Sequence, residues 1–409
     1  METLLTKKAS ELEKFEKLDY LLIILLLAFS GNPFTTLVLE KFTPLIVCTA
    51  IIYFYRKQIK PDFYKRFAII AVGLLVIYLL QLVVLYYVSW LAGIRYIVTI
   101  LLGGLVYYLL GDKFSFKLFI VMYYICLISL FGFLLINILQ INIPGIFFME
   151  GSPRVTYIVY TYLVVDVRNS GMFWEPGAFG GLLSLCIALN IKDLPFLWKR
   201  HKLKVIVVLL ALLSTQSTTT YLVFFAIIIY YLLFFYKNNK IKFAIIPVFI
   251  AISVLVYTNA DFLQAKVDAQ TERSLEQVGS EYSNRRLGSF IFDSYYIKKH
   301  PIVGNGFSAT TRYADHPYLV GQQLGNGNGF SHFMASLGIP FMVLYFALTF
   351  TSLYKISSKV AFLVCMVIFL NLWGEQWLYF PMYMGILFVH NKNKSKGKSK
   401  FESLLYDQK

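Results

Sequence analysis

The sequence has little charge for its length. Of its 409 residues only 15% are Asp, Glu, Lys or Arg, whereas 58% are hydrophobic. Soluble chains carry about 25% charged residues, so this composition argues against a soluble protein. Apolar runs long enough to span a bilayer recur along the chain, and such runs must be helices because lipid offers the backbone no hydrogen-bond partners. The composition therefore predicts a polytopic α-helical membrane protein.

Cysteine and histidine are also scarce, with four and five residues. All four cysteines lie inside apolar segments, and no set of His, Cys, Asp or Glu has the spacing of metal ligands. We therefore expect buried thiols, no disulfide framework, no metal and no cofactor. The charged N-terminus lacks a short apolar core followed by a small-residue cleavage site, so no cleavable signal peptide is expected.

Hydropathy predicts about twelve membrane spans. The fold class that we expect is all-α: a polytopic membrane helical bundle formed by one integral membrane domain, residues 1–409, with a large, partly helical outer loop. The predicted spans are roughly 18–32, 38–55, 67–89, 93–110, 116–140, 173–191, 203–215, 217–236, 241–258, 328–354, 359–373 and 376–391. Residues 203–236 are open to three readings, namely a tight helical hairpin, broken helices or one kinked helix.

The basic residues predict the orientation. Lysine and arginine concentrate in residues 56–66, 192–204 and 237–242 and in the tail, residues 391–409. Cytoplasmic loops carry such an excess, which places these segments and both termini in the cytoplasm. The net charge of +16 is then mostly topological. Because no aromatic and basic platform accompanies it, we expect no nucleic-acid partner.

Two longer segments then face outwards, residues 141–172 and the large outer loop 259–327. Within the loop, residues 283–301 have apolar side chains near helical spacing, Ser283 or Asn284 as a cap, and Pro301 after the end. We expect this helix to lie along the membrane surface, over the bundle.

Arginines stand out on this outer side, where a positive-inside chain usually avoids them. Arg168 opens a predicted span, Arg285 and Arg286 open the loop helix, and Arg312 lies further along the loop. Arginine suits a bidentate grip on phosphate, and a helix N-terminus also favours an anion. The alternative is interfacial snorkelling or ion pairing with nearby acids such as Glu175, Asp166 and Asp293.

Two outer side chains are candidate bases. Glu175, in "FWEPG", precedes a proline that fits the first turn of a helix, where the dipole favours a negative charge. That placement is a complete structural explanation, and the functional alternative is a base or a partner that orients Arg168. His332 lies near the outer start of a predicted span, where it either meets a substrate hydroxyl or is a satisfied interface histidine.

Four stretches between about 160 and 350 together resemble the superfamily of O-antigen polymerases (Wzy) and O-antigen ligases, which are GT-C type membrane glycosyltransferases. They are "RNSGMFWEPGAFG" (168–180), "LLSTQSTTTYL" (212–222), "HPIVGNGF" (300–307) and "NGFSHFMASLGIPFMVLYF" (328–346). The residue before Asn328, often histidine in the family, is Gly327 here, so His332 or His316 would substitute for it.

The resemblance implies a metal-independent polymerase on the outer face of a bacterial inner membrane. A hydroxyl of one lipid-linked repeat unit would attack a glycan carried on undecaprenyl pyrophosphate, and lipid pyrophosphate would leave. Glu175 or His332 would be the catalytic base, and Arg168, Arg285 and Arg286 would bind pyrophosphate. Arg312, His316 and Asn328 would be further substrate contacts. The partners implied are the lipid-linked oligosaccharide, membrane lipid, a chain-length-regulating co-polymerase and a flippase.

Two rival functions stay open. A ligase of the same superfamily would use the same donor with lipid A-core or a protein as acceptor. The glutamate of "FWEPG" favours a polymerase, because the ligase-like segments tend towards asparagine there. A flippase or other transporter would keep ionisable groups near the bilayer midplane. Here the predicted span interiors are nearly free of them.

Overall fold

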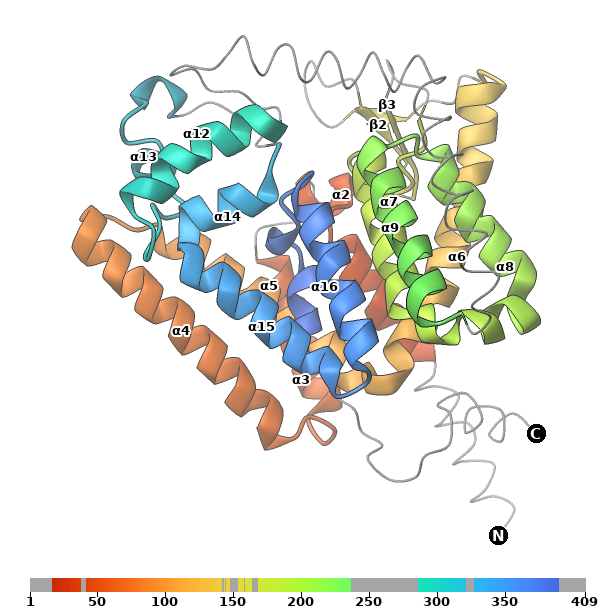
Figure 1. The fold of residues 1–409 in the computed structure, drawn as a ribbon, viewed down its shortest axis with the longest axis horizontal. Coiled ribbons are helices and arrows are strands. Elements are labelled where there is room, and N and C mark those ends of the chain that lie inside the picture. Colours follow the sequence, from red (N-terminus) through yellow and green to blue (C-terminus); the bar gives the residue numbers. More distant parts are fainter. Residues whose placement is uncertain are drawn as a thin grey trace.

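The computed structural model describes residues 17–37, 42–141, 143, 145–147, 154–157, 159–163, 168–236, 286–320 and 327–389. In these residues the chain is mainly helical, and residues 17–28 form the first helix (Figure 1). The α-helices that follow are α2 (Pro33–Leu37), α3 (Thr43–Tyr55), α4 (Pro61–Leu85), α5 (Trp90–Leu110), α6 (Phe114–Gly132), α7 (Pro176–Leu189), α8 (Leu194–Ser214), α9 (Thr218–Phe234), α12 (Arg286–Lys299), α13 (Ala309–Arg312), α14 (Gly329–Leu337), α15 (Ile339–Tyr354), α16 (Ser358–Leu372) and α17 (Pro381–Met384).

Short helices of other types connect or extend them. They are η1 (Gly111–Lys113), the π-helix η2 (Phe133–Ile138), η3 (Ile191–Asp193), η4 (Pro317–Leu319), η5 (Trp377–Tyr379) and η6 (Gly385–Phe388). The all-α prediction is thus confirmed as a class, with one addition that hydropathy gave no sign of. Strands β1 (Ile146–Phe147), β2 (Arg154–Thr156) and β3 (Thr161–Leu163) form a small antiparallel sheet in the order β1-β2-β3.

Fewer helices than predicted are built to cross a membrane. Only α4 and the 49-residue run Trp90–Ile138 are long and apolar enough within the described residues. Two bent pairs raise the number to four if each is one span: α7 with η3 and α8, bent by 61°, and α14 with α15, bent by 117°. These findings fit membrane association and fall short of the twelve spans predicted.

The shortfall has physical causes. Helices α3, α9 and α16 have only 13, 17 and 15 residues, whereas one crossing takes about 20. The predicted helix 376–391 is wrong, because its residues 377–388 form η5, α17 and η6, which are buried against α5. The predicted span 241–258 lies outside the described residues.

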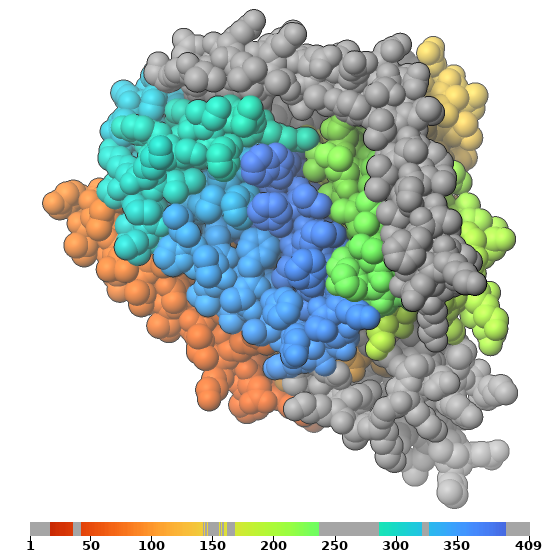
Figure 2. Space-filling model, in the orientation of Figure 1, coloured from red at the N-terminus to blue at the C-terminus, as the bar shows by residue number. Residues whose placement is uncertain are grey.

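Helix α12, the predicted loop helix, packs over the other helices through α14. Helix α5 packs against α17 and η6, α16 packs between α15, α7 and α9, and α12 rests on α14. Figure 1 shows α12 and α13 at the upper left, and β2, β3 and the upper ends of α7 and α9 at the upper right. In Figure 2 the teal surface of α12 and α13 lies directly against the blue surface of α14 to α16. The helix predicted at 283–301 is confirmed over Arg286–Lys299.

Candidate functional site

The first part of the site is the start of α7. Glu175 stands just before Pro176 with an extended backbone (φ −159°, ψ 163°), and the proline occupies a first-turn position where an N–H has no helical partner. The carboxylate folds back over this turn, since a Cβ added at Gly177 would lie 3.0 Å from Glu175 Oε1. This added Cβ would also lie 3.5 Å from the Oγ of Ser217, the residue that caps the start of α9. The starts of α7 and α9 therefore lie side by side.

Glu375, in the turn after α16, meets Glu175. Its carboxyl group hydrogen-bonds the side chains of Glu175 and Trp174. The Trp174 ring also stacks on Phe380 at 4.9 Å, which fixes the turn against the start of α7. Burial, followed by the neighbouring Glu175 carboxylate, raises the pKa of Glu375 well above its ordinary value. A carboxylate next to a carboxyl group favours the protonated form of that group, and here the group is Glu375.

Arg286, the first residue of α12, supplies the cation. A Cβ added at Gly374 would lie 3.6 Å from Arg286 Nη2, so the guanidinium lies against the turn that carries Glu375. Burial lowers the pKa of Arg286, and the charges of Glu375 and Glu175 oppose that shift. We call Glu175, Glu375 and Arg286 the carboxylate cluster.

Helix N-termini surround this cluster. Helix α14 begins against it, because a Cβ at Gly329 would lie only 2.0 Å from the carbonyl oxygen of Glu375. Asn328 caps α14 by accepting from the N–H of Ser331 at 3.0 Å, and its Nδ2 donates to the carbonyl of Arg286 at 3.5 Å. The N-termini of α7, α9 and α14 thus converge beside Arg286, and each adds partial positive charge.

A second buried set of charges lies further along α12. Asp293 accepts hydrogen bonds from Arg312 and, at 2.6 Å, from Ser331 Oγ. The side chains of Arg312 and Asp293 are 2% and 0% exposed. The guanidinium also lies over the rings of Tyr296 and Tyr313, at 4.9 and 5.2 Å. Its Nε and Nη1 have no hydrogen-bond partner in the part of the chain that the structure describes.

Each of the two candidate histidines lies within hydrogen-bonding distance of a tyrosine hydroxyl. His332 Nε2 lies 2.8 Å from the hydroxyl of Tyr379, and its buried Nδ1 has no partner within the described residues. His316 Nδ1 lies 2.6 Å from the hydroxyl of Tyr296. His332 follows Ser331 and so lies beside the Asp293–Arg312 pair, whereas His316 is part of an aromatic cluster on the outer side of α12.

The structure therefore brings some of the predicted residues together. Glu175, Arg286 and Asn328 meet in one place, and Arg312 and His332 form a second set nearby. Arg168 is half-buried, and the backbone of Asn169 beside it is fixed to the end of α8 at Ser214. Arg286 is a cation that interacts with both glutamates. Arg285 lies outside the described residues.

Sequence reasoning missed Glu375, the partner of Glu175. A signal was present, since Glu375 stands in "WGEQW" (373–377), an acid flanked by aromatic residues at the outer end of a predicted span. Glu175 in "FWEPG" was selected on the same pattern. Asp293 was weighed only as an ion-pair partner, and the structure gives it that role with Arg312.

Comparison with known proteins assigns the chain to no family. The chain matches no protein-family model, and none of the curated proteins matches it significantly. Among the residues that the structure describes, no three His, Cys, Asp or Glu side chains are grouped so that they could hold a metal ion.

Proposed function

We propose that the protein is a membrane glycosyltransferase that polymerises a surface polysaccharide, with the carboxylate cluster as its reaction centre. The substrates would be oligosaccharide repeat units carried on undecaprenyl pyrophosphate, joined at the outer face of the bacterial inner membrane. The observation that carries the proposal is a pair of adjacent glutamates, Glu175 and Glu375, held beside Arg286 where the N-termini of α7, α9 and α14 meet.

This arrangement supplies what glycosyl transfer from a pyrophosphate requires. The acceptor hydroxyl forms a bond to the anomeric carbon while the bond from that carbon to the pyrophosphate oxygen breaks. The lipid pyrophosphate leaves with the electron pair, and the hydroxyl proton passes to the ionised carboxylate of the Glu175–Glu375 pair. In this proposal Arg286 and the helix N-termini stabilise the charge that develops on the leaving group.

The remaining predicted residues take supporting roles. Arg312 is neutralised by Asp293, and we assign it the task of fixing α12 over α14; its two unpartnered N–H groups also suit an anion. His332 stays a second candidate base, oriented by Tyr379. Arg168 is a candidate contact for the lipid pyrophosphate further from the glutamates. A multi-pass membrane topology with both termini in the cytoplasm belongs to this proposal, as do a co-polymerase and a flippase as partners.

The test is elongation by purified protein of a synthetic undecaprenyl-pyrophosphate oligosaccharide, in buffer without divalent metal. We expect a ladder of longer glycans. Arg286→Ala should slow it by about 10²–10³-fold, Arg286→Lys should retain more activity, and Glu175→Gln should lose about 10²–10⁴-fold. Lys299→Ala, which removes an exposed cation from the other end of α12, is the matched control and should leave the ladder intact.

The outcomes separate the alternatives. A ladder unaffected by Arg286→Ala and Glu175→Gln would keep the enzyme and reject the site. Transfer of one unit to lipid A-core, without a ladder, would indicate the ligase. Movement of intact lipid-linked sugar across the liposome membrane, with no change in the length of the glycan, would indicate a transporter.

A further inference from the structure

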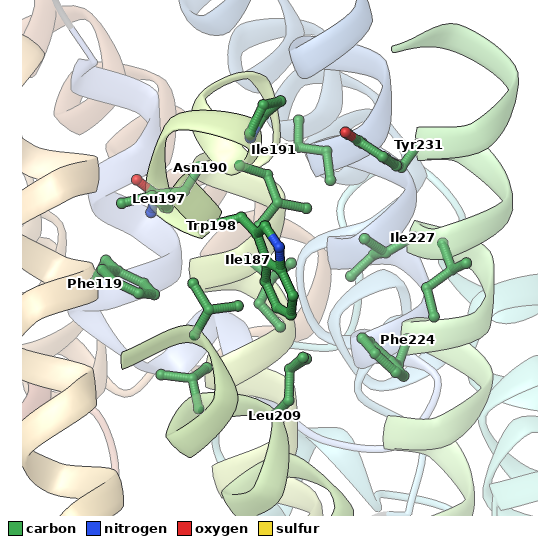
Figure 3. A pocket seen from close by; sticks show the side chains of 15 residues that line it. Phe119, Ile187, Asn190, Ile191, Leu197, Trp198, Leu209, Phe224, Ile227 and Tyr231 are labelled. Carbon is green, nitrogen blue, oxygen red and sulfur yellow. The ribbon is translucent and has the colours of Figure 1, made fainter. Parts of the chain in front are cut away.

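An apolar cavity of about 520 Å³ lies between α8 and α9 (Figure 3). Helix α8 packs on α6 and α7, whereas α9 packs on α7 and α16, so the two consecutive helices leave a space between them. Its lining is almost entirely aliphatic and aromatic: Phe119, Ile187, Asn190, Ile191, Leu194, Pro195, Leu197, Trp198, Val205, Val208, Leu209, Phe224, Ile227, Ile228 and Tyr231. The volume falls within the range of about 300–1,000 Å³ in which protein pockets hold ligands.

This cavity is separate from the carboxylate cluster. It lies at the C-terminal end of α7, where Ile187 lines it, whereas Glu175 stands at the N-terminal end of the same helix. Helix α7 has 14 residues and is therefore about 21 Å long. The two sites belong to opposite ends of the bundle.

The residues beside the cavity are basic. Trp198 lines it and is 47% exposed, and Lys199, Arg200 and Lys202 follow directly and are exposed. The ammonium group of Lys202 lies 5.6 Å from the Trp198 ring centroid, so the charge stands over a lining residue. Residues 192–204 contain five lysines and arginines and one acid, Asp193. An apolar cavity thus adjoins a patch of positive charge. The excess of lysine and arginine in residues 192–204 places this patch on the cytoplasmic side of the membrane.

We propose that this site binds an anionic phospholipid of the cytoplasmic leaflet, with an acyl chain in the cavity and the phosphate on Lys199, Arg200 and Lys202. Basic pockets between membrane helices on the cytoplasmic side recognise acidic headgroups in this way. A zwitterionic lipid would gain the same apolar contact but not the charge attraction. The site does not depend on the proposed glycosyl transfer and concerns the other face of the molecule.

The experiment uses Trp198 as its reporter. Purified full-length protein in detergent is titrated with phosphatidylglycerol or phosphatidylcholine carrying the same brominated acyl chains, which quench nearby tryptophan. The signal of Trp198 is the difference between wild type and Trp198→Phe. We expect phosphatidylglycerol to quench this signal with about tenfold higher apparent affinity than phosphatidylcholine. The preference should disappear in the triple variant Lys199→Gln/Arg200→Gln/Lys202→Gln.

Two matched controls make the result specific. Lys57→Gln/Lys60→Gln/Lys65→Gln removes three exposed charges from another basic loop and should keep the preference. Ile228→Phe narrows the cavity and should weaken quenching by both lipids, whereas Leu222→Phe, on the exposed face of the same helix, should not. Equal affinity for the two lipids, equal loss in both triple variants, or no effect of Ile228→Phe would overturn the proposal.

Discussion

At the scale of single residues, charge that is half-buried or fully buried sets the end of the protein beneath α12 apart. Glu175, Arg286 and Arg312 were all identifiable in the sequence, because charge is scarce and each stands at the edge of an apolar or amphipathic segment. The residues that interact with them could not be identified from the sequence. Glu375 is 200 residues from Glu175, and no local pattern shows that two distant carboxyl groups will share a hydrogen bond.

The buried Asp293–Arg312 pair should be important for stability. Asp293→Asn removes the counter-charge of a guanidinium that is 2% exposed, and we expect a loss of about 3–5 kcal/mol in the free energy of unfolding. The exposed Lys299–Asp315 pair is the control, and Asp315→Ala should cost less than about 1 kcal/mol. Unfolding titrations in detergent measure both.

A double variant separates lost charge pairing from lost packing. Asp293→Leu/Arg312→Met leaves no unpaired buried charge, so it should be more stable than Asp293→Asn. A double variant less stable than Asp293→Asn would contradict this account of the pair.

Glu375 should make stability depend on pH. Its pKa in the folded protein is raised above the ordinary 4.5, so the fold favours the protonated carboxyl. The contribution is fully present below pH 4.5 and is lost as the pH rises through the higher folded-state pKa. Glu375→Gln resembles the protonated form and should remove this loss. Melting temperatures of the two proteins should therefore diverge above pH 4.5, with the variant the more stable; a difference that is constant with pH would refute the raised pKa of Glu375.

At the scale of elements, the sequence predicted helices better than it predicted spans. The predicted loop helix ends within two residues of the observed end at Lys299, because its apolar spacing and Pro301 are local signals. The segment 203–236, left open between a hairpin and a kinked helix, forms two helices that break at Thr215–Ser217. Hydropathy could not distinguish a lipid-exposed helix from a buried irregular one, so residues 377–388 were misjudged. The two- and three-residue strands of the sheet are too short to give an alternating pattern.

The bend between α14 and α15 depends on Gly338. Its backbone (φ 84°, ψ 162°) is one that residues with a side chain avoid, and an added Cβ would lie 1.9 Å from the carbonyl oxygen of Ile302. Gly338→Ala should destabilise the protein by at least about 1–3 kcal/mol. Gly73→Ala, in α4 with no atom within 4 Å of the added Cβ, should be neutral or stabilising by up to about 1 kcal/mol. Equal melting temperatures for the two variants would contradict a strained bend.

At the scale of the whole molecule, two ends carry different chemistry. The carboxylate cluster and the Asp293–Arg312 pair gather under α12 at one end, and the apolar cavity with its basic patch lies at the other end of α7. Between them the interior is mainly apolar, with core residues from α5, α7, α16 and η6 almost fully buried. This difference between the two ends suits an enzyme that works on one face of a membrane and binds lipid at the other face.

The two ends should be accessible from opposite sides of the membrane. Cysteines introduced at Lys202 and at Asp315 lie at exposed positions, whereas three of the four native cysteines are buried and the fourth is half-buried. In intact cells a membrane-impermeant thiol reagent should label Asp315→Cys, and Lys202→Cys should react only after the membrane is opened. Labelling of both, or of neither, in intact cells would contradict the orientation inferred from the basic loops.

The central claim is that the carboxylate cluster performs glycan transfer, and Glu375 tests it most directly because only the structure places it there. The measurement is the rate at which wild type and Glu375→Gln extend undecaprenyl-pyrophosphate oligosaccharide, each at saturating substrate. We expect a multi-unit ladder from wild type and a fall in kcat of about 10²–10⁴-fold in the variant, with a folded protein and little change in KM. A Glu375→Gln protein that extends the glycan at the wild-type rate would contradict the claim.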